Sequence, residues 1–183
     1  WLDERSWVDV HRGWLADDDD VYAAVLEKAP WHQGRLWRYE RYVTEPRLSA
    51  PARDLAGLHP SLMEAHRAVH RQYGVTFDRP ALAQYRDGRD SVAFHRDREM
   101  RWLEDTVIAV LTLGAQRPWL LRPRRTEQAT HDVSPASGDL LVMGGRCQAD
   151  WEHSVPKVQR AVAPRISVQW RWTSRRGRPE IGP

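Results

Sequence analysis

Hydrophobic residues recur at helical spacing in two stretches of the first half of the chain. In the first stretch, apolar residues follow the acidic run 17–20, whose aspartates predict a cap that complements the helix dipole. A metal site on these side-by-side aspartates is the alternative. In the second stretch, residues 59–72, Pro60 marks the start of a helix and Gly74 its end. Residues 30–58 lack a clean period and predict irregular hairpins or loops.

The second half of the chain has the shorter alternation that is typical of strands. The apolar run 106–113 ends at Gly114, and residues 165–172 alternate most clearly. The other predicted strands are 81–85, 90–95, 118–122, 130–133 and 140–143. Two helices followed by about seven or eight short strands predict an α+β protein that contains a β-sandwich or barrel.

Composition narrows the class of protein. The chain has 183 residues, of which 41% are hydrophobic and 29% charged, so we expect one folded domain, 1–183, rather than a disordered chain. The longest apolar stretch, 107–111, is too short to span a membrane. The single cysteine, Cys147, excludes an internal disulfide and favours a cytoplasmic location. Because the chain begins at Trp1 rather than Met, we expect it to be trimmed from a longer one.

The net charge of +3 is unevenly distributed. Residues 1–45 carry 6 basic and 10 acidic side chains, whereas residues 115–183 carry 12 basic and 6 acidic ones. A basic C-terminal third suits a polyanion such as nucleic acid, although a general preference for arginine over lysine is the alternative. Much of the excess consists of Arg117, Arg122, Arg124, Arg125, Arg175, Arg176 and Arg178.

A candidate metal site begins with His95 and Asp97, which flank Arg96 on a predicted strand. Side chains two positions apart on a strand share a face. With one distant histidine they form a two-histidine, one-carboxylate set, which leaves three adjacent positions open on Fe(II). His153, 58 residues downstream of His95, is the candidate third ligand. Taken alone, such a pair is more often a surface histidine beside a charged strand end.

His66 and His70 are a competing pair, since they lie four residues apart on one face of the second predicted helix. Two histidines at this spacing can hold zinc. No glutamate follows His66 and no third ligand is obvious, so an ordinary amphipathic helix is the favoured interpretation.

The last predicted strand favours the iron site. Its alternation places Arg165, Ser167, Gln169 and Arg171 on one face, as an ordinary surface strand also would. The two arginines lie about 20 Å apart along the strand, and side chains leaning toward each other leave a gap that fits a small dicarboxylate. Arginine binds a carboxylate through bidentate, charge-assisted hydrogen bonds.

Together, these motifs resemble the AlkB family of Fe(II)- and 2-oxoglutarate-dependent dioxygenases, which remove alkyl groups from nucleobases. The ordered set is Tyr85, Asp87-Gly88, His95-Arg96-Asp97-Arg98-Glu99, Leu113-Gly114, Ser137-Gly138-Asp139-Leu140, His153-Ser154-Val155-Pro156 and Arg165 to Arg171. The resemblance covers residues 80–172 and implies a catalytic core folded as a double-stranded β-helix, or jelly roll, with buttressing N-terminal helices. Residues 1–58 resemble the family only loosely, and we expect them to form a lid-like extension.

The resemblance also implies roles for individual residues. The implied Fe(II) ligands are His95, Asp97 and His153. The implied 2-oxoglutarate site consists of Tyr85 and Arg165 at the distal carboxylate, Ser167 beside them, and Arg171 near the metal-side carboxylate or bracing Asp97. O₂ is the implied second cosubstrate.

Two positions depart from the family pattern. The family usually has asparagine two residues before the tyrosine and two residues after the first arginine, whereas this chain has Ala83 and Ser167. Both asparagines help to bind 2-oxoglutarate in relatives, so their replacement puts the affinity for this cosubstrate in doubt.

Substrate contacts are the least determined part of the resemblance. Glu99 lies where relatives carry an acidic residue that reads the base edge, with a solvated charge as the alternative. Arg98 is the other predicted polar contact with the base. Possible stacking residues are Trp37, Tyr39, Tyr42 and Trp102, for which plain packing is the alternative.

The resemblance therefore predicts a monomeric repair enzyme that oxidatively dealkylates N-alkylated bases in DNA or RNA. The base must be single-stranded or flipped out of the duplex to enter the pocket. Two alternatives stay open: the same chemistry on a protein side chain or small metabolite, and a nucleic-acid-binding domain with a degenerate pocket.

Overall fold

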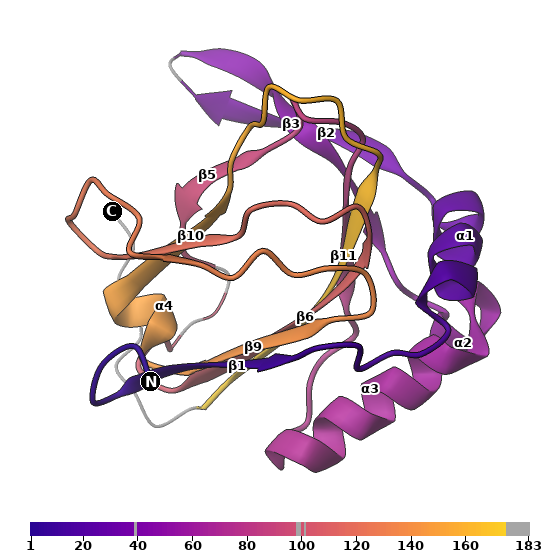
Figure 1. The fold of residues 1–183 in the computed structure, drawn as a ribbon, viewed down its shortest axis with the longest axis horizontal. Coiled ribbons are helices and arrows are strands. Elements are labelled where there is room, and N and C mark those ends of the chain that lie inside the picture. Colours follow the sequence, from indigo (N-terminus) through magenta and orange to yellow (C-terminus); the bar gives the residue numbers. More distant parts are fainter. Residues whose placement is uncertain (39, 98–99, 101, 175–183) are drawn as a thin grey trace.

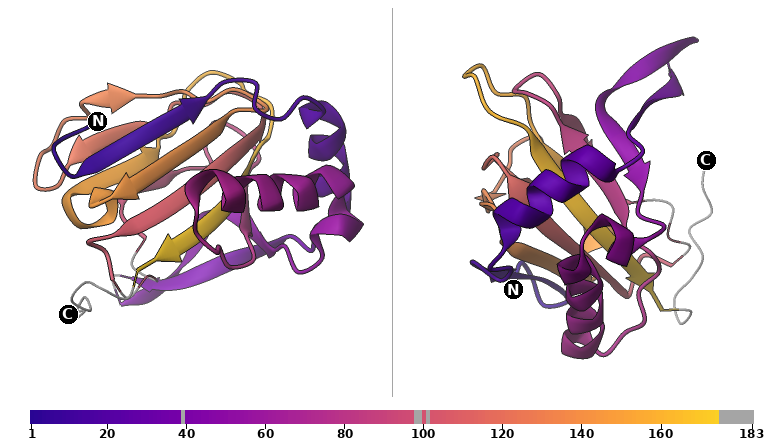
Figure 2. Two further views of the ribbon diagram at one scale, coloured as in Figure 1. Left: turned by 90° about the horizontal axis from the view of Figure 1, so that it is seen from below. Right: turned by 90° about the vertical axis from the view of Figure 1, so that its right-hand side faces the viewer.

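The computed structural model describes residues 1–38, 40–97, 100 and 102–174, which form two facing antiparallel sheets and a helical layer (Figures 1 and 2). The larger sheet has the strand order β1 (Ser6–His11), β9 (Leu140–Gly145), β6 (Thr106–Gly114), β11 (Arg165–Thr173), β4 (Ala81–Tyr85), β3 (Arg41–Pro51) and β2 (His32–Arg38). The smaller sheet has the order β5 (Val92–His95), β10 (Trp151–Val155), β7 (Leu120–Pro123) and β8 (His131–Asp132). The helices are α1 (Asp18–Lys28), α2 (Leu55–Leu58), α3 (Pro60–Tyr73) and α4 (Cys147–Asp150). This α+β arrangement is a jelly roll with helices against one face, as expected.

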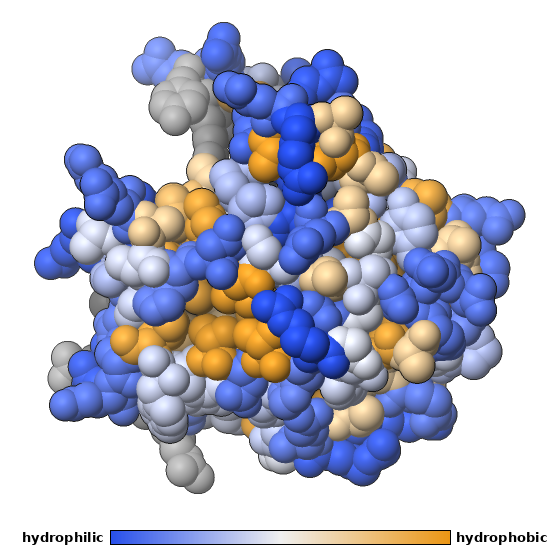
Figure 3. Space-filling model, viewed as in Figure 1, coloured by the Kyte–Doolittle hydropathy of each residue, from blue (hydrophilic) through white to orange (hydrophobic). Residues whose placement is uncertain are grey.

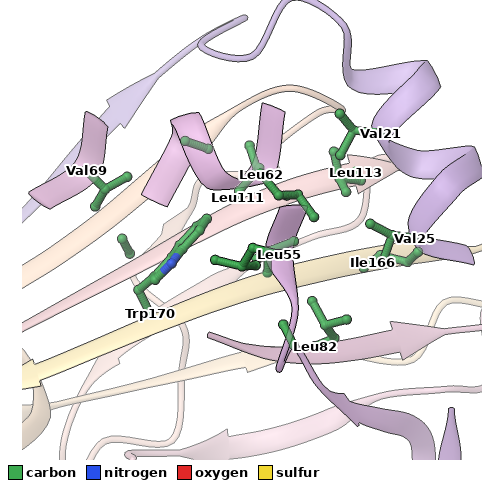
Figure 4. Close-up of a cluster of buried hydrophobic side chains, with 14 of the residues drawn as sticks. Val21, Val25, Leu55, Leu62, Val69, Leu82, Leu111, Leu113, Ile166 and Trp170 are labelled. Carbon is green, nitrogen blue, oxygen red and sulfur yellow. The ribbon is translucent and has the colours of Figure 1, made fainter. Parts of the chain in front are cut away.

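The central strands of the larger sheet are apolar on both faces because each face has its own core. Along β6, Leu111 belongs to the core under the helices, whereas Ile108 and Val110 belong to the core between the sheets. Figure 4 shows the first core, where Leu62 of α3 lies against Trp170 of β11. Burial on both sides explains why residues 107–111 form a continuous apolar run.

Both predicted helices are confirmed, and the bounds predicted for the second, 59–72, agree with α3 to within a residue. Pro60 is the first residue of α3, and the helix ends at Gly74, whose φ of 65° is favourable for glycine. Three aspartates occupy the first turn of α1, where they complement the helix dipole. Asp17 at the cap position does not cap α1, because its carboxylate accepts a hydrogen bond from Ser61 Oγ.

Both histidines of the alternative zinc pair are tied to the core instead. Trp170 Nε1 donates a hydrogen bond to His66 Nδ1, and the Phe77 backbone N–H donates one to His70 Nε2. Each ring therefore uses a nitrogen as an acceptor for a buried donor. The amphipathic-helix interpretation is the one that the geometry supports.

The expectation of irregular hairpins or loops over residues 30–58 is confirmed in part, because β2 and β3 form a hairpin with an irregular register. The hairpin is long and joins the larger sheet through β4, which was not expected, and the short helix α2 follows it. Figure 2 shows the hairpin extending beyond the body of the protein. Its register shifts between Gln33 and Arg35, and this irregularity interrupts the alternation that would have revealed a strand. The edge strand β1 also went unpredicted.

The outer surface is largely hydrophilic. Figure 3 shows polar residues over most of one face, with apolar residues visible between β9 and β10, where the two sheets face each other. Among the described residues, no helix has the length and apolar character needed to cross a membrane.

Candidate active site

A pocket opens between the two sheets, and strands that are distant in sequence supply its walls. β4, β5, β10 and β11 contribute most of the lining, and β3 of the hairpin adds one side chain. The lining residues are Arg47, Tyr85, Val92, His95, Arg96, Asp97, Ile108, Val110, Trp119, His153, Val155, Ser167, Gln169 and Arg171. All three predicted metal ligands and three of the four predicted 2-oxoglutarate residues therefore line one pocket.

His95, Asp97 and His153 converge as the sequence predicted. Their candidate ligand atoms all lie within 4.8 Å of one another, and they form the only such group of three among the described residues. His95 and His153 are partners in the register of β5 and β10, with ring centroids 4.3 Å apart. One detail of the prediction is wrong, since β5 ends at His95 and Asp97 follows the strand rather than belonging to it.

The protonation states of the three side chains suit a divalent metal. His95 Nδ1 donates a hydrogen bond to the Ala93 carbonyl, 2.9 Å away, so its Nε2 carries the lone pair and lies 3.5 Å from Asp97 Oδ1. Burial, together with nearby positive charge, lowers the pKa of His153 to about 3, which keeps its ring neutral. Burial alone would raise the pKa of Asp97, but the neighbouring His95 and the charge of Arg171 hold it well below its usual range.

Two imidazoles and one ionised carboxylate form the donor set that Fe(II) oxygenases use, so the residues fit the metal. Arg171 Nε donates to Asp97 Oδ2 at 2.6 Å and orients this carboxylate. Of the two positions predicted for Arg171, the geometry therefore supports bracing of Asp97.

Two residues that support the ligands went unpredicted. Gln148 Oε1 accepts a hydrogen bond from the Asp97 backbone N–H at 2.8 Å, and both residues are buried. The Trp119 ring stacks on His153 with centroids 5.1 Å apart. Neither residue belongs to a recognisable motif, and only the fold brings them to the site.

We expect Gln148→Leu to weaken metal binding by about 10- to 100-fold, since groups that hold metal ligands typically contribute this much. The variant leaves the Asp97 N–H buried without an acceptor and loosens the loop that carries the carboxylate. Titration of the protein with Mn(II) measures the effect. Gln116→Leu, which changes an exposed glutamine, is the matched control, and equal affinities for both variants would contradict the role of Gln148.

One of the predicted 2-oxoglutarate residues, Arg165, is a buried positive charge that forms no ion pair with any described residue. Arg165 is 1% exposed, and its guanidinium donates to Ser167 Oγ at 2.8 Å and Thr112 Oγ1 at 3.0 Å. Its Nε has no hydrogen-bond partner, and burial lowers the pKa of Arg165 to about 10. A carboxylate placed between Arg165 and Tyr85 would neutralise this charge, so these residues fit a dicarboxylate.

Most of the predicted substrate residues cannot be compared with the structure. Tyr39, Arg98 and Glu99 lie outside the described residues, and their roles stay predictions. Trp102 is partly buried, and its carbonyl accepts a hydrogen bond from the Thr173 hydroxyl.

Other side chains that the sequence singled out are now placed. On the hairpin, Trp37 and Tyr42 are 63% and 62% exposed and pack edge to face. Cys147 is buried outside the pocket lining, and burial raises the pKa of its thiol to about 12, so it takes no part in the site.

The basic surface is smaller than the sequence suggested. Arg117 is 1% exposed and donates hydrogen bonds to the carbonyls of Asp87, Asp90 and Pro156, so it holds loops together. Arg122 pairs with Glu152 at 2.8 Å, which neutralises its charge. Among the described members of the set, Arg124 and Arg125 retain charges without an acidic partner, and the other three members lie outside the described residues.

Two facing antiparallel sheets with a two-histidine, one-carboxylate group between them define a jelly-roll oxygenase of the non-haem iron class. The family model described as the 2OG-Fe(II) oxygenase superfamily matches residues 19–178, and the chain belongs to this family.

Curated relatives place the chain near the AlkB branch of the family, in agreement with the resemblance seen in the sequence. The chain is 28% identical to "Alpha-ketoglutarate-dependent dioxygenase alkB homolog 3" of Homo sapiens, over 86% of this chain and 62% of that protein. It is 32% identical to "DNA oxidative demethylase ALKBH2" of Mus musculus, over 61% of this chain and 50% of that protein. The chain thus spans less than two thirds of the length of these relatives.

Solved structures share the fold at low sequence identity. The structure of OsALKBH1 superposes with a TM-score of 0.62 at 14% identity, covering 90% of this chain and 97% of that one. A 2OG-Fe(II) oxygenase from Burkholderia pseudomallei superposes with a TM-score of 0.60 at 14% identity, covering 96% of this chain and 89% of that one. These similarities agree with the jelly-roll architecture.

Proposed function

We propose that the chain catalyses Fe(II)- and 2-oxoglutarate-dependent oxidative dealkylation of N-alkylated bases in DNA or RNA. The observation that carries the proposal is the pocket, which His95, Asp97 and His153 line together with Tyr85 and Ser167. Behind this lining, the buried guanidinium of Arg165 donates to Ser167 and lies over the Tyr85 ring. Relatives named as an AlkB homologue and as a DNA oxidative demethylase support nucleic acid as the substrate. We also propose that the enzyme is monomeric and cytoplasmic; the single cysteine, Cys147, supports the location.

Each pocket residue has a distinct task in this reaction. The two histidines and Asp97 would hold Fe(II), Arg171 and Gln148 would keep Asp97 in place, and Arg165 with Tyr85 would bind the far carboxylate of 2-oxoglutarate. When bound, the iron with 2-oxoglutarate and O₂ supplies the oxidation of the alkyl carbon. For a methyl group, the hydroxymethyl base then loses formaldehyde, and its ring nitrogen regains a proton or lone pair.

The apolar walls of the pocket help to exclude water. Ile108 and Val110 of β6, which belong to the core between the sheets, line the pocket from the larger sheet. Val92 and Val155 line the pocket from the smaller sheet. Exclusion of water strengthens the electrostatic hold on both carboxylates of the cosubstrate. A base held in a duplex cannot enter this space, so single-stranded or flipped bases are the expected substrates.

The proposal is tested by incubating iron-loaded protein with 2-oxoglutarate, ascorbate and oligonucleotides that carry 1-methyladenine or 3-methylcytosine. Both lesions are cationic and unable to pair normally, which makes extrusion easier. We expect each repaired oligonucleotide to lose about 14 mass units per methyl group, together with release of formaldehyde and succinate. The Asp97→Ala protein is the control. Consumption of 2-oxoglutarate without any mass loss from DNA or RNA would instead favour a protein or small-molecule substrate.

We also expect the paired reversals Arg124→Glu and Arg125→Glu to weaken oligonucleotide binding and to flatten its salt dependence. Each lost phosphate contact lowers the slope of log K against log salt by about one. Fluorescence anisotropy at several salt concentrations measures both quantities. Reversal of Arg53 and Arg71, two exposed arginines near the helical layer, changes the net charge equally. If the two double variants bind alike, the surface around β7 has no special role.

A further inference from the structure

Arg47 is a pocket residue that no sequence motif marks. It lies on β3 of the hairpin, and its Nη1 donates a long hydrogen bond of 3.4 Å to Tyr85 Oη. Leu48 pairs with Gln84 in the adjoining strands, which brings Arg47 beside Tyr85 on the pocket face. The hairpin thus contributes a guanidinium to a pocket whose other polar residues come from the catalytic core.

The backbone conformation around Arg47 directs its side chain toward the pocket. The shift in register leaves Gly34 of β2 opposite residues 45–47, a bulge of the kind that redirects a side chain next to a functional site. A Cβ at Gly34 would lie 2.0 Å from Glu45 Oε2, so glycine is what leaves room for the Glu45 side chain. The Ser91 N–H donates to the Pro46 carbonyl at 2.8 Å and ties the bulge to the segment before β5.

The two other arginines predicted to bind the cosubstrate already have polar partners, which explains why Arg47 matters for a dianionic ligand. Arg171 is bound by Asp97 and Gln169, and Arg165 by two hydroxyl groups. Among the described residues, the sole hydrogen-bond partner of Arg47 is the neutral Tyr85 hydroxyl. A tyrosine hydroxyl has one proton to donate and accepts through its lone pairs. With a lone pair of Tyr85 engaged by Arg47, that proton is free for a ligand.

We propose that Arg47 is a positioning residue for 2-oxoglutarate. It orients the Tyr85 hydroxyl toward the carboxylate that Arg165 holds, and it adds positive charge on the hairpin side of the pocket. Ala83 and Ser167, which stand where the family usually has asparagine, are paired neighbours in β4 and β11. Arg47 therefore adds a polar group for 2-oxoglutarate from the hairpin, outside these two strands. The inference rests on the proposed function, because it takes 2-oxoglutarate as the ligand.

The test is direct binding, measured without turnover. Calorimetric titration of the Mn(II)-loaded protein with 2-oxoglutarate under argon gives the dissociation constant for the unaltered chain and for Arg47→Met. A hydrogen bond that supports a charged ligand predicts a loss of about tenfold or more. Arg41→Met removes an equal charge from an exposed site on the same strand and is the matched control, for which we expect no change. Equal affinities for Arg47→Met and the unaltered chain would overturn the proposal.

A double-mutant cycle tests whether Arg47 acts through Tyr85. Since the two groups form one unit, adding Arg47→Met to Tyr85→Phe should weaken 2-oxoglutarate binding by clearly less than it does in the unaltered chain. Fully additive losses would overturn the positioning role. Arg47→Lys keeps the charge and should recover part of the affinity, which also guards against a folding defect in Arg47→Met. If the unaltered protein does not bind 2-oxoglutarate at all, the proposed function fails rather than this inference alone.

Discussion

The Asp97→Ala variant is expected to show no iron-dependent formation of succinate. Asp97 is the carboxylate of the candidate metal group, and both its oxygens are engaged, Oδ1 beside His95 and Oδ2 with Arg171. Its removal deletes the anionic ligand and leaves the Arg171 charge without its partner, so both metal affinity and local order should fall. Mass spectrometry of the succinate released at saturating Fe(II) and 2-oxoglutarate tests this loss of activity.

A matched variant separates loss of the site from a general effect. Asp78→Ala removes an exposed aspartate between α3 and β4 and should retain full activity. Melting curves of both proteins check that they fold. Normal succinate release by a folded Asp97→Ala protein would remove the metal assignment.

The second large effect is expected at Arg165. Replacing this buried guanidinium with methionine should raise the 2-oxoglutarate concentration needed for half-maximal turnover by about 100-fold or more, the usual consequence of breaking a buried charge pair. Arg165→Lys should recover only part of the loss, because lysine has no two-pronged donor for a carboxylate. Titration of succinate formation against 2-oxoglutarate measures both variants.

Arg160→Met is the control for Arg165, since it removes an exposed arginine just before β11. Its cosubstrate requirement should match that of the unaltered chain. An unchanged titration in Arg165→Met would show that the distal carboxylate binds elsewhere.

Regular local patterns made much of this fold predictable. Pro60 marks the start of α3 and Gly74 marks its end. Alternation along residues 165–172 identified β11, which carries polar residues into the pocket and apolar residues into the helix-facing core. The ordering of short motifs around His95 and His153 predicted the metal group, whose members are far apart in sequence but adjacent in the sheet register.

The unpredicted features depend on contacts that have no local pattern. The sequence indicated an irregular hairpin but not its long strands or its place in the larger sheet, because the bulge at Gly34 breaks the alternation, and Arg47 lies inside that irregular segment. Trp119 and Gln148 reach the site only through the pairing of β7 with β10 and the placement of α4. Arg117 was counted as surface charge, although it is buried and its Nη atoms donate to three backbone carbonyls.

The most direct test of the central claim is the electron density of a crystal grown without oxygen in the presence of Fe(II) and 2-oxoglutarate. The account predicts one metal ion bound by His95 Nε2, Asp97 Oδ1 and His153. It also predicts 2-oxoglutarate bound to that metal, with its far carboxylate between Tyr85 and Arg165. Metal density at another place, or 2-oxoglutarate bound away from Arg165, would contradict it.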